Sequence, residues 1–318
     1  MFSKLDYVYA VYQERSFTKA AEKLYISQPS LSTAIKNVEK MVGAPLFERS
    51  TTTIKLTEVG KEYIKSAEKI ISIRNSFVDK INDIYNLEIG KISVGGTNYL
   101  TSYVLPRIIN KFSSRFPKIE VDLIEAHSQE LFDRIRNEEI DIVIDSFDGV
   151  LDEYQGYPLL RERVLLCVPA DRKINKNLKQ FAIVPEQIYN DKINLESIPP
   201  VSIELFKDEN FVLLKSGNDM YSRAMKIFNK ANVTPKICFS VDQLNISYAL
   251  ADSGMGLSFA TDTLFKFGKF SSNIILYNIE EEHSGRTLYI AHKKNKYCTK
   301  AMEHFIETAK EVTKLNQI

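Results

Sequence analysis

Side chains that can hydrogen-bond to phosphates and bases are concentrated in one short stretch near the N-terminus. In LYISQPSLSTAIK, residues 24–36, the apolar Leu31 and Ile35 are separated by hydroxyl-bearing residues. On a helix these two residues share one buried face, so the polar side chains point outward. The outward set is Ser30, Thr33, Lys36 and Asn37, with Gln28 and Ser32 at its margins. Such side chains can donate to phosphates and reach base edges in the major groove of DNA.

Pro29 in this stretch indicates the start of a helix. With Ser27 as the N-cap, the proline lies in the first turn, where its missing N–H needs no partner. Residues 17–24 have helical spacing of their own, and a tight turn at residues 25–27 would join the two segments. The spacing therefore predicts a helix-turn-helix, with its second helix at residues 28–41. The outer face of a plain three-helix bundle carries similar residue types, so spacing alone leaves the DNA-binding and the purely structural interpretation open.

Further elements complete this N-terminal unit. A short amphipathic helix is predicted from residue 5 to residue 12, and LFER and IKLT, joined by STTT, predict a two-stranded hairpin that would form a wing. Arg49 lies at the base of this wing and Lys55 on its return strand. In a dimer, two such units would place their second helices on successive major-groove faces, which predicts a two-fold operator.

A long helix is predicted directly after the wing. Apolar residues recur there at alternating spacings of four and three, which is a heptad pattern. The seam is Tyr63, Ala67, Ile70, Arg74, Phe77, Ile81 and Ile84, and a second apolar row is Ile64, Ile71, Val78 and Tyr85. A helix of roughly 28 residues, about 42 Å long, would carry more apolar surface than it can hide alone. Pairing with a second copy in a homodimer is the favoured interpretation, and packing against its own chain is the alternative.

Alternating strands and helices are predicted from Gly90 onward. The β-type runs are KISVGG, IEVDLIEA, DIVIDSF, RVLLCVPA, ENFVLLK, KICFSV and RTLYIAHK. Helices are expected between them at residues 103–116, 129–137, 220–231 and 243–253, and another helix at the C-terminus. This alternation predicts a parallel α/β sheet. Residues 171–208 are polar and proline-interrupted, and they give no clear pattern.

Length and composition set the remaining limits. A chain of 318 residues is too long for one core, so two or three domains are expected. The net charge is +1, and the first 60 residues contain 8 basic and 6 acidic side chains, so a DNA-binding role must rest on geometry. We find no signal-peptide pattern and no run long enough to span a bilayer, which predicts a cytoplasmic protein. Cys167, Cys238 and Cys298 form no CxxC pair, and we expect buried, reduced thiols with no metal site and no cofactor.

Residues 16–60 resemble the N-terminal winged helix-turn-helix of LysR-type transcriptional regulators, and the order of elements up to residue 318 is similar to that family too. The matching positions lie in register without gaps. They are Ser16-Phe17-Thr18, Ala20-Ala21, Leu24, Ser27-Gln28-Pro29, Ser32, Ile35, Glu39, Gly43, Pro45-Leu46-Phe47, Arg49 and Leu56-Thr57. The resemblance implies that the chain is a sequence-specific DNA-binding regulator of transcription.

The resemblance also implies which residues contact DNA. These are Ser27, Gln28, Pro29, Ser30, Ser32, Thr33 and Lys36 on the recognition helix, and Arg49, Thr52 and Thr53 on the wing, together with Thr51. Two positions depart from the family pattern. Thr33 stands where the family often has Arg or another long residue, and the wing tip STTT lacks the usual basic residues. Each lost phosphate contact lowers affinity and flattens its salt dependence, so weaker non-specific binding is expected.

For the remainder of the chain, the resemblance implies a fold like that of a periplasmic binding protein. The expected domains are a winged helix-turn-helix at residues 1–58, a linker and dimerisation helix at residues 59–89, and a two-lobed α/β effector domain at residues 90–318. Lobe I would comprise residues 90–163 and 268–318, and lobe II residues 164–267. The overall class is α/β with an all-α N-terminal part.

The cleft between these lobes is where the family binds a small effector. Residues 95–98 and Ser128 lie where a strand ends and a helix begins, and helix N-termini attract anions at such a crevice. The candidate ligand residues are Thr97, Asn98, Thr101 and Ser128 in lobe I, and Lys215, Ser216 and Thr261 in lobe II. A helix cap is the alternative role for each hydroxyl taken singly. His127 could also donate to a ligand, although a surface histidine is the simpler interpretation. The expected effector is a small anion or carboxylate.

The expected partners are double-stranded DNA, the effector, further copies of the chain in a homodimer or homotetramer, and RNA polymerase. Two other classes of function are less consistent with the sequence. A small-solute-binding protein without a DNA role would leave residues 16–60 unexplained. An enzyme is not indicated, because the chain has no GxSxG, HExxH, Walker loop or CxxC, and neither Asp145 nor Asp148 has an evident catalytic partner.

Overall fold

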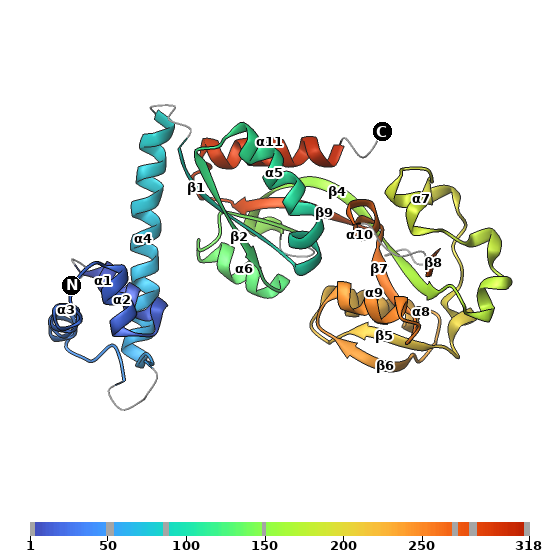
Figure 1. Cartoon of the computed structure of the whole chain (residues 1–318), viewed down its shortest axis with the longest axis horizontal. Helices are drawn as coiled ribbons and strands as arrows, with labels where there is room; N and C mark the ends of the chain where they lie inside the picture. The colour runs from blue at the N-terminus through green and yellow to red at the C-terminus, as the bar shows by residue number, and fades with distance from the viewer. Residues whose placement is uncertain are drawn as a thin grey trace. The chain divides into compact units, whose positions relative to one another are not determined.

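The computed structural model describes residues 4–48, 54–84, 89–147, 151–268, 273–279 and 285–314. The chain divides into two compact units, Met1–Ile81 and Asn82–Ile318, which are described separately below (Figure 1). Within the described residues, no helix combines the length and the hydropathy needed to cross a bilayer.

The first unit is a three-helix core with a short wing. Its helices are α1 (Leu5–Glu14), α2 (Phe17–Lys23) and α3 (Gln28–Val42). The Ser16 side chain caps α2, and the Ser27 side chain caps α3 by accepting from the Ser30 amide, with Pro29 in the first turn as predicted. Tyr25 has a left-handed φ of 54°, and this turn lets Ile26 pack against the core. Gly43 ends α3 in the left-handed region, as a helix C-terminus commonly requires.

The predicted wing is present as one bridged pair, Phe47 with Leu56. Its strands are tied further by a hydrogen bond from the Glu48 amide to the Lys55 carbonyl (2.9 Å). The Glu39 carboxylate accepts from the Leu46 amide (2.7 Å), so it fixes the start of the wing to α3. The wing tip and its base at Arg49 lie outside the described residues.

Helix α4 (Glu58–Ile84) has the predicted length, but its two halves differ. Tyr63, Ile64 and Ala67 are buried in the core of the first unit. The alternative interpretation, that the helix packs against its own chain, is therefore correct for its first half. Farther along, Ile73 is 70% exposed and Phe77 is 64% exposed. Arg74, which interrupts the heptad seam, pairs with Asp6 of α1 (3.0 Å). The apolar stripe of the second half has no cover among the described residues of the first unit.

The second unit is built on a seven-stranded sheet of mixed direction. Its strands are β1 (Gly90–Gly96), β2 (Ile119–Glu125), β3 (Ile142–Asp145), β4 (Tyr154–Pro169), β7 (Ser258–Thr261), β8 (Ile274–Asn278) and β9 (Gly285–Lys293). The order is β2-β1-β3-β9-β4-β7, with β8 also on β4. Among the described pairs, β1 runs parallel to β2 and to β3, and the others are antiparallel. The prediction of a parallel sheet was therefore wrong for the half that contains β9, β4, β7 and β8, because β9 runs antiparallel to both β3 and β4.

Strand β4 joins the two lobes of this unit. Residues 154–163 pair with β9 in lobe I, and residues 164–169 pair with β7 and β8. Strand β8 therefore lies in lobe II, although its residues fall in the segment 268–318 that the sequence assigned to lobe I. Lobe II also holds a parallel pair, β5 (Asn210–Leu214) and β6 (Lys236–Val241), with helices α8 (Asp219–Lys230), α9 (Leu244–Asp252) and α10 (Asp262–Phe267) (Figure 1). The elements predicted for lobe II are present, together with β7, β8 and α10.

Residues 171–208 form short turns instead of a separate domain. They contain α7 (Pro185–Tyr189) and 3₁₀ turns at Lys173–Lys176, Lys179–Phe181, Leu195–Ser197 and Ile203–Phe206. Ile183, Val201 and Phe206 are buried and join the core of lobe II. Their spacing follows these turns, which is why no helix or strand period was visible.

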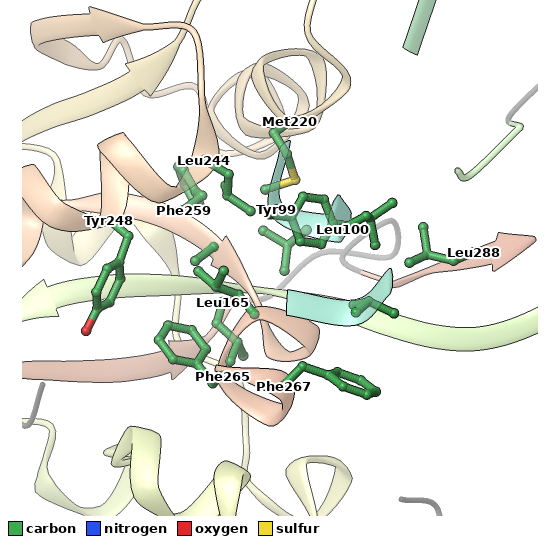
Figure 2. Packing of buried hydrophobic residues seen from close by; sticks show 14 of the residues in the cluster. Tyr99, Leu100, Leu165, Met220, Leu244, Tyr248, Phe259, Phe265, Phe267 and Leu288 are labelled. Atoms are coloured by element: carbon green, nitrogen blue, oxygen red, sulfur yellow. The ribbon is translucent and has the colours of Figure 1, made fainter. Parts of the chain in front are cut away.

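In lobe I, helices cover the sheet on two faces. Ile142 and Ile144 of β3 enter one core with α5 (Leu105–Arg115) and α11 (Lys300–Lys314), whereas Val143 enters a second core under α6 (Ser128–Arg136). A single π-helical turn, Leu100–Val104, leads into α5. Buried residues of β4, β7 and the helices continue this core into lobe II (Figure 2).

The three cysteines are free thiols in different settings. Cys167 is buried, and burial raises its pKa to about 12. Cys298 is half-buried, while Cys238 is exposed on β6. The expectation of a buried thiol was therefore wrong for Cys238, because β6 has both neighbouring side chains, Ile237 and Phe239, in contact with solvent.

Candidate functional sites

The outer face of α3 is largely polar, with the exposed Met41 near its C-terminal end. Leu31, Ile35 and Val38 are buried, and this burial turns the opposite side of the helix to solvent. The residues predicted to contact DNA on this helix are all at its surface: Ser27, Gln28, Pro29, Ser30, Thr33 and Lys36 are exposed and Ser32 is half-buried. The Thr33 hydroxyl donates to the Pro29 carbonyl (2.9 Å), so it is used within the helix. Arg49, Thr51, Thr52 and Thr53 lie outside the described residues.

A cavity of about 350 Å³ lies between the two lobes of the second unit. Lobe I contributes the segments that follow β1 and β2, the end of β3 and Arg286 of β9, and lobe II contributes the segment after β5 and the starts of α8 and α9. Five of the predicted ligand residues line it: Thr97, Asn98 and Ser128 from lobe I, and Lys215 and Ser216 from lobe II. The exposed His127 also lines it.

Thr101 and Thr261 do not line this cavity. The Thr101 hydroxyl donates back to the Asn98 carbonyl (2.9 Å) within its own turn. Thr261 is fully buried, and its hydroxyl caps α10 by accepting from the Leu264 amide. Both hydroxyls are therefore used locally: Thr101 bonds back to the preceding turn and Thr261 caps α10.

Helix starts supply hydrogen-bond donors to the cavity from both sides. Helix α6 begins after His127 and α9 begins after Gln243, and neither of these N-cap residues bonds the helix with its side chain. In α8, by contrast, the Asn218 side chain accepts from the Met220 amide. The free N–H groups of α6 and α9 therefore give the cavity a positive partial charge on each side.

A buried ionic network forms part of the cavity wall, and sequence reasoning missed it. Arg286 of β9 bonds Glu162 of β4, the Tyr99 hydroxyl (3.0 Å) and Asp219 of α8. Tyr99 also donates to Glu162 (3.0 Å). Burial lowers the pKa of Arg286, but the surrounding carboxylates outweigh it and raise that pKa well above its usual value. Because Arg286 belongs to lobe I and Asp219 to lobe II, this ion pair joins the lobes. In the sequence Glu162 stands between Arg161 and Arg163, just before the apolar run VLLCV, and this position gave no sign of burial.

Asp145 ends β3 at the cavity and is 3% exposed. Its Oδ1 atom accepts from the Ser146 amide (2.7 Å), and its Oδ2 atom accepts no hydrogen bond from any residue that the structure describes. Burial raises the pKa of Asp145, while the charge of Arg286 and the polar hydrogens of Ser128 and Ser146 act in the opposite direction. The strand-end rule that selected Thr97 and Ser128 also applies to Asp145, which we had considered only as a catalytic residue.

A second cavity, of about 470 Å³, is lined by Arg161, Glu162 and Arg163 of β4 and by Lys266 of α10. Asp262 lines it, and burial raises the pKa of this carboxyl to about 7. Within the described ranges, no three His, Cys, Asp or Glu side chains come together as metal ligands. Asp148 lies outside those ranges.

Comparisons with known proteins agree over the whole chain. Residues 2–61 match the family model "Bacterial regulatory helix-turn-helix protein, lysR family", and residues 86–314 match "LysR substrate binding domain". An uncharacterised HTH-type transcriptional regulator, YcgK of Bacillus subtilis, is 27% identical over 310 residues, which cover 98% of this chain and 94% of that protein. A probable RuBisCO transcriptional regulator of Phaeodactylum tricornutum is 28% identical over 314 residues, which cover 95% and 94%.

Solved structures share the fold. A full-length variant of OxyR from Pseudomonas aeruginosa has a TM-score of 0.71 at 21% identity, over 97% of this chain and 94% of that one. Full-length CbnR in complex with its target DNA has a TM-score of 0.67 at 18% identity, over 98% and 99%. With both family models matched in order, the chain belongs to the LysR family of transcriptional regulators, with a DNA-binding helix-turn-helix and an effector-binding domain.

Proposed function

We propose that α3 enters the major groove of operator DNA with its exposed polar face. Gln28, Ser30, Thr33 and Lys36 would face base edges and phosphates, with Ser27, Pro29 and Ser32 at the start of the contact. Arg49, Thr52 and Thr53 of the wing would contact the adjacent backbone. The observation that carries this proposal is the burial of Leu31, Ile35 and Val38, since it fixes which side of α3 is free.

The partner assembly proposed here is a homodimer formed through the second half of α4. Ile73 and Phe77 are apolar and exposed there, and an exposed heptad stripe is normally covered by a second helix. Two copies would present two α3 helices to a two-fold operator. Pairing of dimers into tetramers and contact with RNA polymerase follow as further proposals from family membership, as do action in the cytoplasm and the absence of enzymatic activity.

The cavity between the lobes is the proposed effector site. Thr97, Asn98, Ser128, Lys215 and Ser216 line it from both lobes, and the starts of α6 and α9 supply free N–H groups. A small molecule carrying a carboxylate suits both the volume and these donors. Binding would favour one arrangement of the lobes and so shift the populations of dimer or tetramer arrangements on DNA.

A mobility-shift experiment tests the DNA proposal. The probe is the DNA upstream of the protein's own gene and its divergently read neighbour, at low salt, with the folded dimer verified beforehand. We expect a specific complex with the wild type and a loss of specific binding with Gln28→Ala, by on the order of 1–3 kcal/mol if Gln28 reads a base. Gln13→Ala is the matched control, because Gln13 is an exposed glutamine on α1. No retarded species with the wild type would refute the proposal, and equal loss in both variants would refute the assignment of the face.

A further inference from the structure

The cavity holds more buried hydrogen-bond acceptors than the protein satisfies. The Asp145 Oδ2, Asn98 Oδ1 and Thr97 Oγ1 atoms are all buried, and none of them has a hydrogen-bond partner among the described residues. All three residues line the cavity. Unsatisfied buried polar atoms are costly and uncommon in native proteins, so a group of three at one wall indicates a missing partner. An ionised Asp145 and Asn98 can only accept at these atoms, so that partner must be a donor.

Among the described charged side chains around the cavity, one carboxylate also has no positively charged partner. Asp145 and Asp219 line the cavity, and the carboxylate of Glu162 lies next to them on the far side of Arg286. Arg286 pairs with Glu162 and Asp219, and Arg223 pairs with Asp219 (2.8 Å). Three carboxylates thus stand against two guanidinium groups, and Asp145 is the one that pairs with no described cation. At the mouth of the cavity, Lys215 does not supply the missing charge, because it already pairs with Asp242 (2.8 Å).

Donors for an anionic group lie beside the same carboxylate. Ser128, the first residue of α6, lines the cavity, and its hydroxyl group lowers the pKa of Asp145 through a hydrogen-bond interaction. The start of α6 has no side-chain cap, so its N–H groups can bind a carboxylate at that point. A cation acceptor and a carboxylate donor set therefore lie next to each other, and in an α-amino acid the ammonium and carboxylate groups are joined through one carbon.

We propose that the effector is a small α-amino acid or a close zwitterionic relative, whose ammonium group donates to Asp145 and Asn98 and whose carboxylate accepts from the backbone N–H groups at the start of α6, that of Ser128 included. This inference deepens the proposed effector site and rests on it. It adds a positive group to the carboxylate that the helix starts favour, and it assigns Asp145 as the residue that selects for that group.

The test is a binding series on the full-length wild-type dimer, by thermal shift followed by calorimetry, because a ligand that binds the native state raises its melting temperature. The probes are the twenty L-amino acids and, for each that binds, the same skeleton without the amino group and the same skeleton without the carboxylate. We expect at least one amino acid to bind, and both truncated analogues to bind roughly 30-fold more weakly or worse, since each leaves a buried charged partner unpaired. Equal binding of the deaminated acid, or no binding by any amino acid, would overturn the inference.

Asp145→Asn keeps the shape of the side chain and removes its charge. We expect a loss on the order of 30-fold in amino-acid affinity with this variant, and no change with Asp171→Asn, an exposed aspartate outside the cavity. If Asp145→Asn fails to fold, the wild-type ligand series still decides the inference. Operator binding by the wild type, measured in parallel, distinguishes failure of the DNA proposal from failure of the ligand proposal. If the wild type does not bind operator DNA, the DNA proposal is refuted. If it binds operator DNA but no amino acid, only the proposed ligand class is refuted.

Discussion

In the proposed DNA interface, Thr33 is the residue of α3 whose short side chain would most directly limit the reach of the helix toward DNA. Its hydroxyl donates to the Pro29 carbonyl, so little of the side chain is available for a phosphate. We predict that Thr33→Arg adds one phosphate contact, which raises non-specific affinity and steepens the slope of log K against log salt by roughly 0.9. Fluorescence anisotropy with labelled DNA at several salt concentrations measures this slope.

The matched control for Thr33→Arg is Gln13→Arg, which adds the same charge to the exposed side of α1. A steeper slope for Thr33→Arg alone supports the assigned face. The same change of slope in both variants would instead indicate a general effect of charge.

Asp262 should make stability depend on pH. The carboxylate accepts from the Arg163 amide (2.7 Å) and the Thr263 amide (2.8 Å), yet burial raises its pKa from 3.8 to about 7. Because the folded-state pKa lies above the unfolded value, the folded protein retains the proton more strongly. The contribution of Asp262 to the free energy of unfolding is complete below about pH 4 and is lost as the pH rises through about 7, by on the order of 4 kcal/mol.

Urea unfolding at about pH 5 and about pH 8 measures this effect. The free energy of unfolding should differ less between these two pH values in Asp262→Asn than in the wild type. Parallel pH dependence in both proteins would show that another group titrates. The variant isolates Asp262 because the other ionisable groups of the chain are unchanged.

At the residue scale, the sequence predicted the role of a residue only where its partners lie close to it in the chain. Ser27 and Pro29 act on the helix in which they stand, so the sequence predicted the cap and the first turn correctly. Glu162, Arg286 and Asp219 are far apart in the chain and meet only when β4, β9 and α8 are assembled. No spacing rule could have predicted that network.

Helix α4 is buried along its first half and exposed along its second half. Its first half completes the core of the first unit, while Ile73, Phe77 and Val78 of the second half remain exposed. We predict that Phe77→Glu weakens dimer formation by more than tenfold, because it places a charge in the proposed helix pair. Sedimentation over a range of concentrations measures the dissociation constant.

Asn75→Glu is the control for Phe77→Glu, because it adds the same charge at an exposed polar position of α4. A normal dimer with Phe77→Glu would contradict the role given to α4. The heptad pattern predicted the helix and its apolar stripe, but it could not show which half the chain covers itself, since that depends on the tertiary contacts of Tyr63 and Ala67.

Strand β4 illustrates the limit of element prediction. Only its second half was predicted, because the first half, YQGYPLLRE, contains glycine and proline and lacks a clear alternation. Its direction could not be predicted either, since antiparallel pairing with β9 joins residues more than 120 positions apart.

On the scale of the whole molecule, two sites must communicate for the chain to act as a regulator. In the second unit, β4 continues from one lobe into the other, and the Arg286–Asp219 ion pair joins the lobes at the cavity. A ligand that binds beside Asp145 contacts residues on both sides of this pair, so its binding energy can depend on how the lobes are arranged. Such a dependence is what a ligand needs in order to shift a conformational equilibrium.

The most direct test of the central claim is a hydroxyl-radical footprint of the wild-type dimer on the DNA upstream of its own gene. The account predicts two protected segments with two-fold sequence symmetry, centred on the same face of the helix and separated by roughly 10 base pairs or a multiple of that. It also predicts that Gln28→Ala abolishes both segments, whereas Gln13→Ala preserves them. A single protected segment, or none with folded dimer present, would contradict it.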